Sequence, residues 1–414
     1  MLRLQNISIS KHLPSKTTTL ISTCFLLISS LLILINYPST TNTLLSTLSF
    51  QFFSPFSNTT NSFANNSSSN VDYTPSNKKI HTTNCDIFDG RWVYDESYPV
   101  YGPSSCPYVD HQFSCFNNGR HDLGYLKYRW QPYGCDIPRF DAKKMMEMLR
   151  GKRLVFVGDS LSRNMCQSLI CHLMEFEGQS YRDGSFYNYY FKDYNCSISL
   201  IIAPFLVQEH RLPNKKGTLR LDTMEATISK YRDADFLIFN TGHWWNPNKS
   251  ENGKNFYQEG DVVHSNMTVG VAYTKALKTW AKWVDTNVNT TKTQVFYRGY
   301  ANTHFRGGDW DTKGTCNNEI TPITDEKLLK PYSWLMQTLE TVISEMKTPV
   351  IYLNITKSTA YRKDGHPSWY RGGKLRRGGI QDCSHWCLPG IPDSWNQFLY
   401  ASLLFSSKGA NMTS

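Results

Sequence analysis

The chain contains the segment Arg153-Leu154-Val155-Phe156-Val157-Gly158-Asp159-Ser160-Leu161-Ser162-Arg163-Asn164, which predicts a buried strand, a sharp turn and the start of a helix. The strand is an apolar run rich in β-branched and aromatic residues, and it ends at Gly158, which can adopt backbone conformations that other residues resist. Beyond the turn, apolar residues recur at the four-residue spacing of one helix face: Leu161, Met165, Leu169 and Leu173.

This pattern places Ser160 at the mouth of a strand–turn–helix unit. The first N–H groups of a helix have no partner within the helix, so they can hold a developing oxyanion beside a nucleophile. Ser160 is therefore a candidate nucleophile. The alternative is a serine that only caps the helix, and Gly-Asp-Ser alone does not decide between the two.

Strand and helix patterns alternate along the rest of the chain. Asp141 is a candidate N-cap for a helix that ends at Gly151. We therefore predict an α/β fold with a mostly parallel sheet, helices on both faces, and ligands bound at the carboxyl ends of the strands. Further buried strands are expected at residues 198–203, 236–239, 295–297 and 350–353, and helices around Leu277, Trp280, Ala281 and Val284 and around Leu335, Leu339, Val342 and Met346.

The N-terminal region predicts membrane attachment. Residues 18–37 are apolar and uncharged over about the 20 residues that span a bilayer. Positive charge precedes them, so residues 1–17 are expected in the cytosol and the remainder in the lumen; a cleaved signal peptide is the alternative. Residues 38–80 are rich in Ser, Thr and Asn and predict a disordered stem. The net charge of +10 is a mild bias that suits an acidic partner, without the interleaving that would indicate a nucleic-acid groove.

Glycosylation sequons and cysteines agree with a lumenal position. An even number of cysteines in an oxidising compartment indicates disulfides, and zinc at Cys383, His385 and Cys387 is disfavoured because no second pair has suitable spacing. Residues 85–137 predict a disulfide-stapled, loop-rich cap before a catalytic domain at 138–414. Sequons follow the apolar segment at Asn58, Asn65, Asn66, Asn195, Asn248, Asn266, Asn289, Asn354 and Asn411, and ten cysteines follow it at 85, 106, 115, 135, 166, 171, 196, 316, 383 and 387.

A base for Ser160 is available near the C-terminus. Asp382 and His385 are three residues apart, so in a turn or helix they share a side. Asp382 could then accept a hydrogen bond from one imidazole nitrogen while the other nitrogen faces Ser160. The alternative is an aspartate that caps a local turn beside an ordinary histidine.

The combination of Gly-Asp-Ser after a strand with Asp-x-x-His near the end of the domain resembles the SGNH/GDSL esterases. The closer resemblance is to the plant trichome-birefringence-like proteins, and it covers the chain from Cys85 to the end, together with the membrane segment and the stem. The motifs that carry it are residues 85–92 (CDIFDGRW), 157–164 (VGDSLSRN), Trp244-Trp245, Arg306-Gly307-Gly308, His366-Pro367-Ser368 and 382–396 (DCSHWCLPGIPDSWN).

The resemblance implies a single-pass type II Golgi membrane protein that O-acetylates a cell-wall polysaccharide. Ser160 would be the acyl-accepting nucleophile, His385 the general base and acid, and Asp382 the orienting carboxylate. No cofactor would be bound; an acetyl donor, acetyl-CoA or another acetyl carrier, would be a substrate. The turn residues Gly158 and Asp159 would position the nucleophile, and the oxyanion would be held by the Ser160 N–H with Arg163, Asn240 or Gly242, although the usual Gly-x-Asn-Asp block is absent.

The same resemblance implies disulfides Cys85–Cys135, Cys106–Cys171, Cys115–Cys387 and Cys316–Cys383, with Cys166 and Cys196 free. Flat aromatic rings suit sugar faces and arginines suit uronic acid carboxylates, so candidate substrate-binding residues are Trp244, Trp245, Trp386, Arg298 and Arg306. Core packing is the alternative for any one tryptophan, although Trp244 and Trp245 cannot both face the core of a regular strand.

Three functions remain open at this point: an O-acetyltransferase, an acetylesterase that uses the same triad with water as acceptor, and a noncatalytic protein that binds a wall polymer. The sequence does not choose between xylan, pectin, xyloglucan and mannan, and it does not define the oligomeric state.

Overall fold

The computed structural model describes residues 85–210, 217–372 and 379–410, which belong to one compact unit, residues 78–414. The expected cytosolic tail, membrane segment and stem lie outside the described residues. Within the described ranges, no helix is both long enough and apolar enough to cross a membrane.

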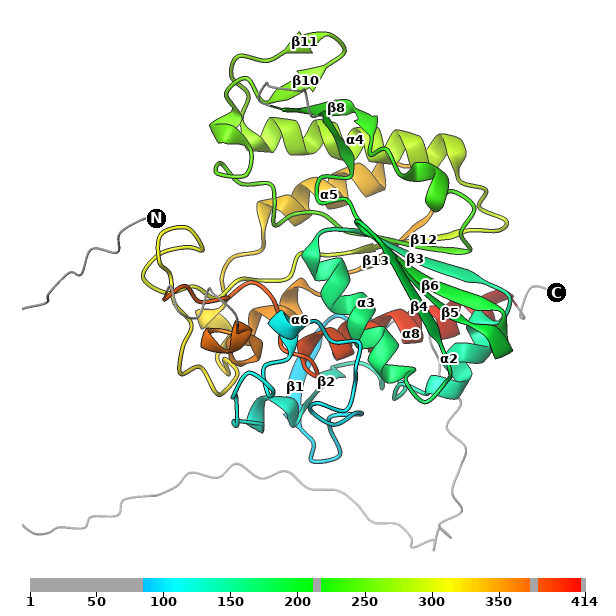
Figure 1. Ribbon diagram of the computed structural model, residues 1–414, viewed down its shortest axis with the longest axis vertical. Helices are drawn as coiled ribbons and strands as arrows, with labels where there is room; N and C mark the ends of the chain where they lie inside the picture. The colour runs from blue at the N-terminus through cyan, green and yellow to red at the C-terminus, as the bar shows by residue number, and fades with distance from the viewer. Residues whose placement is uncertain (1–84, 211–216, 373–378, 411–414) are drawn as a thin grey trace, which may run out of the picture. The chain divides into compact units, whose positions relative to one another are not determined.

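A seven-stranded sheet forms the centre of the unit (Figure 1). Five neighbouring strands are parallel, and two antiparallel strands extend one edge, so the sheet is mostly parallel as predicted. All four further strands expected from apolar runs are present. The order is β13 (Val350–Leu353), β12 (Gln294–Arg298), β9 (Phe236–Phe239), β3 (Arg153–Gly158), β6 (Cys196–Ile202), β5 (Phe186–Phe191) and β4 (Gln179–Asp183).

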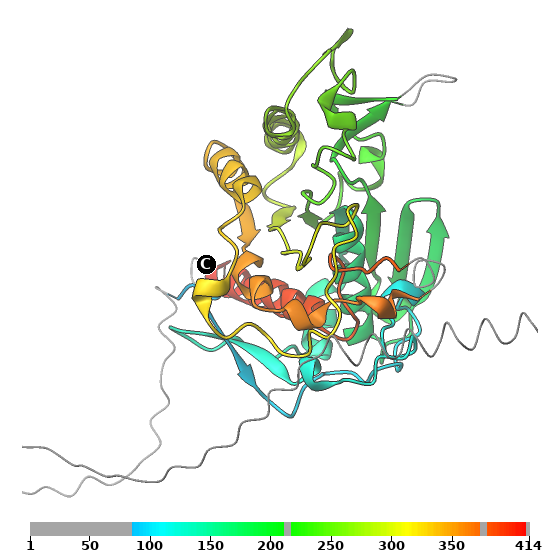
Figure 2. The ribbon, with the colours of Figure 1, turned by 90° about the vertical axis from the view of Figure 1, so that its left-hand side faces the viewer.

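Helices cover both faces of this sheet, because alternate residues of each central strand point to opposite sides. In β3, Leu154 and Phe156 join one hydrophobic core, and Val155 and Val157 join the other. The first core packs against α2 (Ala142–Leu149), α3 (Ser160–His172) and α8 (Ile391–Ala410); the second packs against α4 (Val269–Asn287) and α5 (Trp334–Ser344). Figures 1 and 2 show α4 and α5 together on one side of the sheet.

Helix starts follow the expected capping chemistry. The Asp141 carboxylate accepts a hydrogen bond from the Lys144 N–H at 2.9 Å, and Gly151 with φ +71° follows the helix, as predicted. At α3 the cap is Asp159, whose Oδ1 accepts from the Leu161 N–H at 2.9 Å. The Ser160 hydroxyl is therefore not needed as a cap.

Gly158 is required for a different reason than the sequence suggested. It ends β3 without a positive φ, so the expectation of an unusual backbone conformation is wrong. A Cβ at this position would overlap the carbonyl and side-chain oxygens of Asn240. The glycine instead allows the chain after β9 to approach the start of α3 closely.

A second, four-stranded sheet was not predicted. It packs on α4, where the Thr279 hydroxyl donates to the Leu221 carbonyl at 2.5 Å. Its longest strand, residues 218–224, interleaves apolar with polar residues, and its other three strands have only two to four residues, so none contains the apolar run that revealed the central strands. Their order is β11 (Val262–Val263), β10 (Tyr257–Glu259), β8 (Thr218–Met224) and β7 (Val207–His210).

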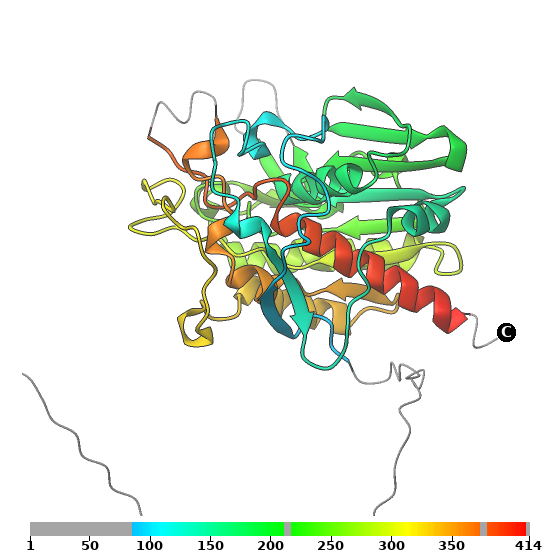
Figure 3. The same cartoon turned by 90° about the horizontal axis from the view of Figure 1, so that it is seen from below.

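The N-terminal part of the unit is loop-rich. Its antiparallel pair β1 (Gly90–Tyr94) and β2 (Tyr128–Pro132) packs beside α8 through Trp130 (Figure 3). The short helices of the unit are η1 (His111–Phe113), η2 (Gly124–Leu126), η3 (Lys192–Tyr194), η4 (Ile228–Lys230), η5 (Glu251–Gly253), η6 (Glu326–Leu328), α6 (Thr356–Ala360), η7 (Lys363–Gly365) and η8 (Trp369–Arg371).

Four disulfides join the described residues, with the pairing that the resemblance implied. One lies within the loop-rich part, and two tie that part to α3 and to the segment before α8. The two remaining described cysteines, Cys166 and Cys196, are free and buried, as expected. The bonds are Cys85–Cys135, Cys106–Cys171, Cys115–Cys387 and Cys316–Cys383.

Candidate active site

Three side chains from distant parts of the sequence meet beyond the carboxyl end of β3. His385 Nε2 lies 2.7 Å from Ser160 Oγ, and His385 Nδ1 lies 2.8 Å from Asp382 Oδ2. With Nδ1–H donating to the carboxylate, Nε2 is left to accept the serine proton. Both distances are within the reach expected of a nucleophile, its base and an orienting group.

Asp382 is held in its ionised form. The carboxylate is buried, yet Oδ1 accepts from the N–H groups of Ser384 and His385 at 3.1 and 3.0 Å, and Arg371 Nε lies 3.4 Å from Oδ2. Burial acts to raise the pKa of Asp382, but the charge and hydrogen bonds of His385, and then Arg371, outweigh burial and hold the pKa well below its usual value. Asp382 can therefore orient and stabilise a protonated His385.

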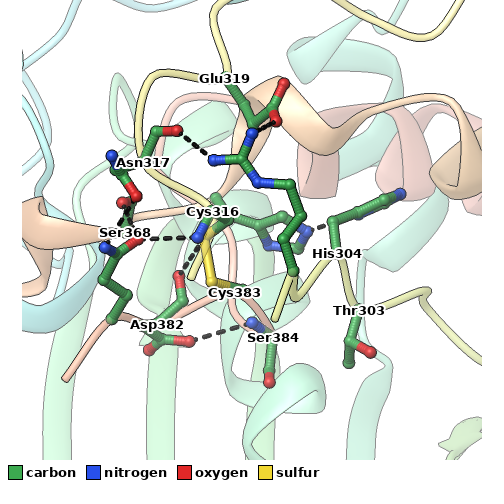
Figure 4. The surroundings of a disulfide bond; sticks show 12 residues. Thr303, His304, Cys316, Asn317, Glu319, Ser368, Asp382, Cys383 and Ser384 are labelled. Atoms are coloured by element: carbon green, nitrogen blue, oxygen red, sulfur yellow. Dashed lines mark hydrogen bonds and ion pairs between the residues drawn. A yellow bond between two sulfur atoms is a disulfide. The ribbon is translucent and has the colours of Figure 1, made fainter. Parts of the chain in front are cut away.

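The loop that carries Asp382 and His385 is anchored on several sides. Asp382 forms an isolated antiparallel bridge with Ser368, and the ring of His385 lies 5.4 Å from that of Phe113. Two disulfides flank the pair, at Cys383 and Cys387. Figure 4 shows the Cys316–Cys383 bond with Asp382, Ser384 and Asn317 around it.

Removing the Cys316–Cys383 bond is expected to loosen this loop. The bond closes 67 residues, and a loop of this size contributes about 2–5 kcal/mol to the free energy of unfolding. A Cys316→Ser/Cys383→Ser double variant should therefore unfold at a lower temperature and turn over more slowly. The control is Cys166→Ser, which removes a free thiol; equal melting temperatures for the double variant and the wild type would contradict the expectation.

A buried polar network fixes the start of α3 behind Ser160. Asn240 accepts from the Ser162 hydroxyl and donates to Asp159 Oδ1 at 2.8 Å. Arg298 Nη2 and His243 Nδ1 each lie 3.7 Å from the Asp159 carboxylate. Burial would raise the pKa of Asp159, but His243, Arg298 and Asn240 together lower it. Burial lowers the pKa of Arg298 to about 10, against the opposing charge of Asp159, so Arg298 stays charged near neutral pH.

Ser160 opens onto a cleft of about 370 Å³. Arg163 lies beside it, one turn along α3, with Nη1 3.3 Å from Asp110 Oδ2 and its guanidinium over the Phe113 ring. The lining carries two arginines and no acidic residue: Ser160, Arg163, Arg182, Gly184, Ser185, Tyr187, Ile202, Pro204 and Trp244.

The structure separates the two adjacent tryptophans. Trp244 lines the cleft, whereas Trp245 is 3% exposed and its Nε1 donates to the Thr241 hydroxyl at 2.8 Å. The prediction that Trp245 binds substrate is therefore wrong. Trp386 is also wrong as a sugar contact, because it is fully buried and stacks on His366 with ring centroids 4.0 Å apart.

Neither predicted arginine lines the cleft. Arg298 is 1% exposed and its guanidinium faces the buried carboxylate of Asp159, so its predicted contact with substrate is wrong. Arg306 is exposed, but its Nη1 lies 2.6 Å from Glu319 Oε1. Gly242 is buried against the ring of Tyr300, and a Cβ there would lie 3.1 Å from that ring.

Several residues at the site were missed by sequence reasoning. Arg182 comes from the edge strand β4 and Tyr187 from its neighbour β5, and the sequence of neither strand indicated a site. Arg371, which contacts Asp382, carries no sequence motif of its own. Phe113, in the loop-rich part, carries no motif that would link it to His385.

The combination of a serine after the first central strand and an Asp-x-x-His loop defines an SGNH-type acyl-ester enzyme fold. A family model described as the GDSL/SGNH-like acyl-esterase family found in Pmr5 and Cas1p matches residues 137–402, and a PMR5 N terminal domain model matches residues 83–136. Acyl-ester hydrolysis or transfer is therefore the class of chemistry.

The chain belongs to the trichome-birefringence-like family. Protein trichome birefringence-like 4 of Arabidopsis thaliana is 54% identical over 345 residues, which cover 78% of this chain and 76% of the relative. Protein trichome birefringence-like 1 and Protein trichome birefringence of the same plant are 49% and 48% identical over 77% and 78% of this chain. The matched regions span only 61% and 56% of these two relatives.

Proposed function

We propose that this protein is an O-acetyltransferase that transfers acetyl groups to hydroxyls of a plant cell-wall polysaccharide. The observation that carries the proposal is the contact of His385 with both Ser160, at 2.7 Å, and Asp382, at 2.8 Å. Membership of an acyl-esterase family supports the same chemistry.

The reaction proceeds in two displacements. Ser160 Oγ attacks the acetyl carbonyl of the donor while His385 Nε2 accepts the hydroxyl proton, and the tetrahedral intermediate collapses as His385 returns that proton to the leaving group. In the second displacement, a sugar hydroxyl gives its proton to His385 and attacks the acetyl-serine. The released Ser160 regains the proton from His385.

The oxyanion of each tetrahedral intermediate needs donors beside Ser160. The Ser160 N–H is one of the helix-start N–H groups without an intrahelical partner, and the Arg163 guanidinium lines the same cleft. Asn240 contributes by packing against Gly158 and by donating to Asp159, whereas Gly242 packs against Tyr300.

The cleft favours an acidic acceptor. Arg182 stacks on Tyr187 at 4.6 Å, and Lys249 lies over the rings of Trp244 and Trp310 at 4.9 and 4.8 Å. These flat rings and cations suit a glycan that carries carboxylates. We therefore place uronic-acid-containing polymers ahead of neutral ones among the candidate acceptors.

An Arg182→Ala variant tests this preference. We expect KM for an acidic oligosaccharide to rise about threefold to tenfold with kcat little changed, because an exposed charge pair contributes about 1 kcal/mol. KM for a neutral oligosaccharide should stay the same. Arg232→Ala is the control, because Arg232 is an exposed arginine whose Nε lies 3.9 Å from Asp233 Oδ2. An equal rise in KM for neutral and acidic acceptors would argue against charge recognition.

Transfer must be distinguished from hydrolysis, since the same triad serves an acetylesterase. The purified full-length protein is incubated with an acetyl donor and xylan, pectin, xyloglucan or mannan oligomers, and products are analysed by mass spectrometry. Acetylated oligomers support transfer. Net deacetylation of acetylated oligomers without transfer would instead identify an esterase.

We also propose a single-pass type II Golgi membrane protein with its catalytic domain in the lumen. The four disulfides support an oxidising compartment. Four sequon asparagines of the described residues are exposed: Asn195, Asn248, Asn266 and Asn289.

A further inference from the structure

Two histidines lie behind the loop that carries the catalytic base. His366 follows η7, is 2% exposed, and stacks on Trp386, the residue after His385. His304 lies in the segment after β12, and its backbone N–H donates to the Cys383 carbonyl at 3.1 Å. The His304 ring also lies 6.2 Å from the Trp386 ring, so both histidines contact the chain next to His385.

Each ring uses one nitrogen to bind a carbonyl oxygen. His304 Nε2 lies 2.9 Å from the Ala360 carbonyl, and His366 Nδ1 lies 2.7 Å from the carbonyl of His385 itself. A carbonyl only accepts, so both nitrogens carry hydrogen. The remaining nitrogens, His304 Nδ1 and His366 Nε2, lie 2.7 Å from each other.

These contacts require more hydrogens than two neutral rings possess. A neutral imidazole carries one N–H, and both are already used on the carbonyls. Without a third hydrogen, two lone pairs would face each other at hydrogen-bond distance inside the protein. We infer that His304 and His366 together bind one extra proton, and that this shared proton fixes the main chain of His385 and so positions the catalytic ring.

The charged groups around the pair help to determine the pH at which it holds that proton. The pKa of His304 is affected by the charges of Asp364, Glu319 and Lys330. The pKa of His366 is affected by the charges of His304, Asp382 and His385. The His366 carbonyl also accepts a hydrogen bond from Arg120 at 3.1 Å. Burial lowers the pKa of His304 to about 4, opposed by the Ala360 carbonyl and the two acids, and lowers the pKa of His366 well below its usual value. The pair therefore takes up its proton on acidification and releases it as the pH rises, which loosens the contact with His385.

The His304→Asn variant separates the effect of the extra proton from the effect of the hydrogen bond between residues 304 and 366. An asparagine amide can place a neutral N–H near the position of Nδ1, so it can donate to His366 Nε2 without an extra proton. We expect kcat within about threefold of wild type at acidic pH, since one hydrogen bond replaces another. His366→Phe removes the contact with the His385 carbonyl and should lower kcat about 10- to 100-fold at every pH.

The test combines nitrogen NMR of the full-length chain, carrying ¹⁵N-labelled histidine, with kcat measured against pH. We expect three N–H groups on the pair at acidic pH, loss of one as the pH rises, and a decline in wild-type kcat at that same pH which His304→Asn does not show. Two N–H groups at every pH, or the same kcat profile in both proteins, would overturn the inference. The inference about positioning rests on the proposed role of His385, but the NMR result does not depend on activity, so failure of either proposal can be recognised separately.

Discussion

Replacing Ser160 with alanine is expected to abolish acetyl transfer. The variant keeps Asp159 as the cap of α3, but it removes the hydroxyl that lies 2.7 Å from His385 Nε2. Loss of a triad nucleophile lowers kcat on the order of 10⁴- to 10⁶-fold. Incubation with donor alone should add one acetyl group to the wild-type protein at Ser160, detectable by peptide mass spectrometry, and none to the variant.

The matched control is Ser185→Ala, because Ser185 is a second serine that lines the same cleft and is not a member of the proposed triad. It should retain the acetyl-enzyme and most of the turnover. If Ser160→Ala still transferred acetyl groups at the wild-type rate, the covalent route would be wrong. If both variants bound glycan equally and neither they nor the wild type turned over, a noncatalytic binding protein would be the better description.

Asp382→Asn is expected to have the second largest effect. An amide cannot stabilise the imidazolium that forms when His385 accepts the serine proton, and it can turn a donor toward Nδ1, which selects the wrong tautomer. kcat should fall on the order of 10⁴-fold with KM little changed. Arg371 would also lose its charged partner. Rates, KM and the melting temperature should be measured together, so that a folding defect is recognised.

Asp311→Asn is a suitable control, since Asp311 is exposed and is not part of the triad or the cleft lining. It should leave both kinetic constants unchanged. A fall in affinity with normal kcat for Asp382→Asn would identify Asp382 as a binding residue and contradict the proposed orienting role.

Sequence reasoning located the parts of the fold that depend on continuous apolar runs. β9 and β13 were placed at their observed bounds, and α2 was placed through its capping residue and terminal glycine. Ser160, Asp382 and His385 could be proposed as partners because each lies in a short motif with a chemical reason. The disulfide pairing came from family resemblance, because cysteine positions alone leave many pairings open.

Burial in the folded chain explains most of the substrate-binding residues that could not be predicted correctly from the sequence. Arg298 looked available for substrate, but its positive charge offsets Asp159 in the interior. Trp245 and Trp386 looked equal to Trp244 as sugar contacts, yet only Trp244 lines the cleft. A tryptophan or arginine in sequence does not reveal its partner, because that partner comes from a distant element. The pairing of His304 with His366 could not be predicted for the same reason, because their ring nitrogens come from segments that are distant in the sequence.

The bond between Cys115 and Cys387 spans 272 residues and has a consequence for biosynthesis. During translation Cys115 emerges long before its partner, and Ser160 is made well before Asp382 and His385. A polypeptide terminated between Cys316 and Asp382 would carry the proposed nucleophile without its base and would leave Cys115 and Cys316 without their native partners. The proposed triad is therefore complete only after His385 has been synthesised, so transcripts truncated before that residue should yield inactive proteins even when most of the sheet is encoded.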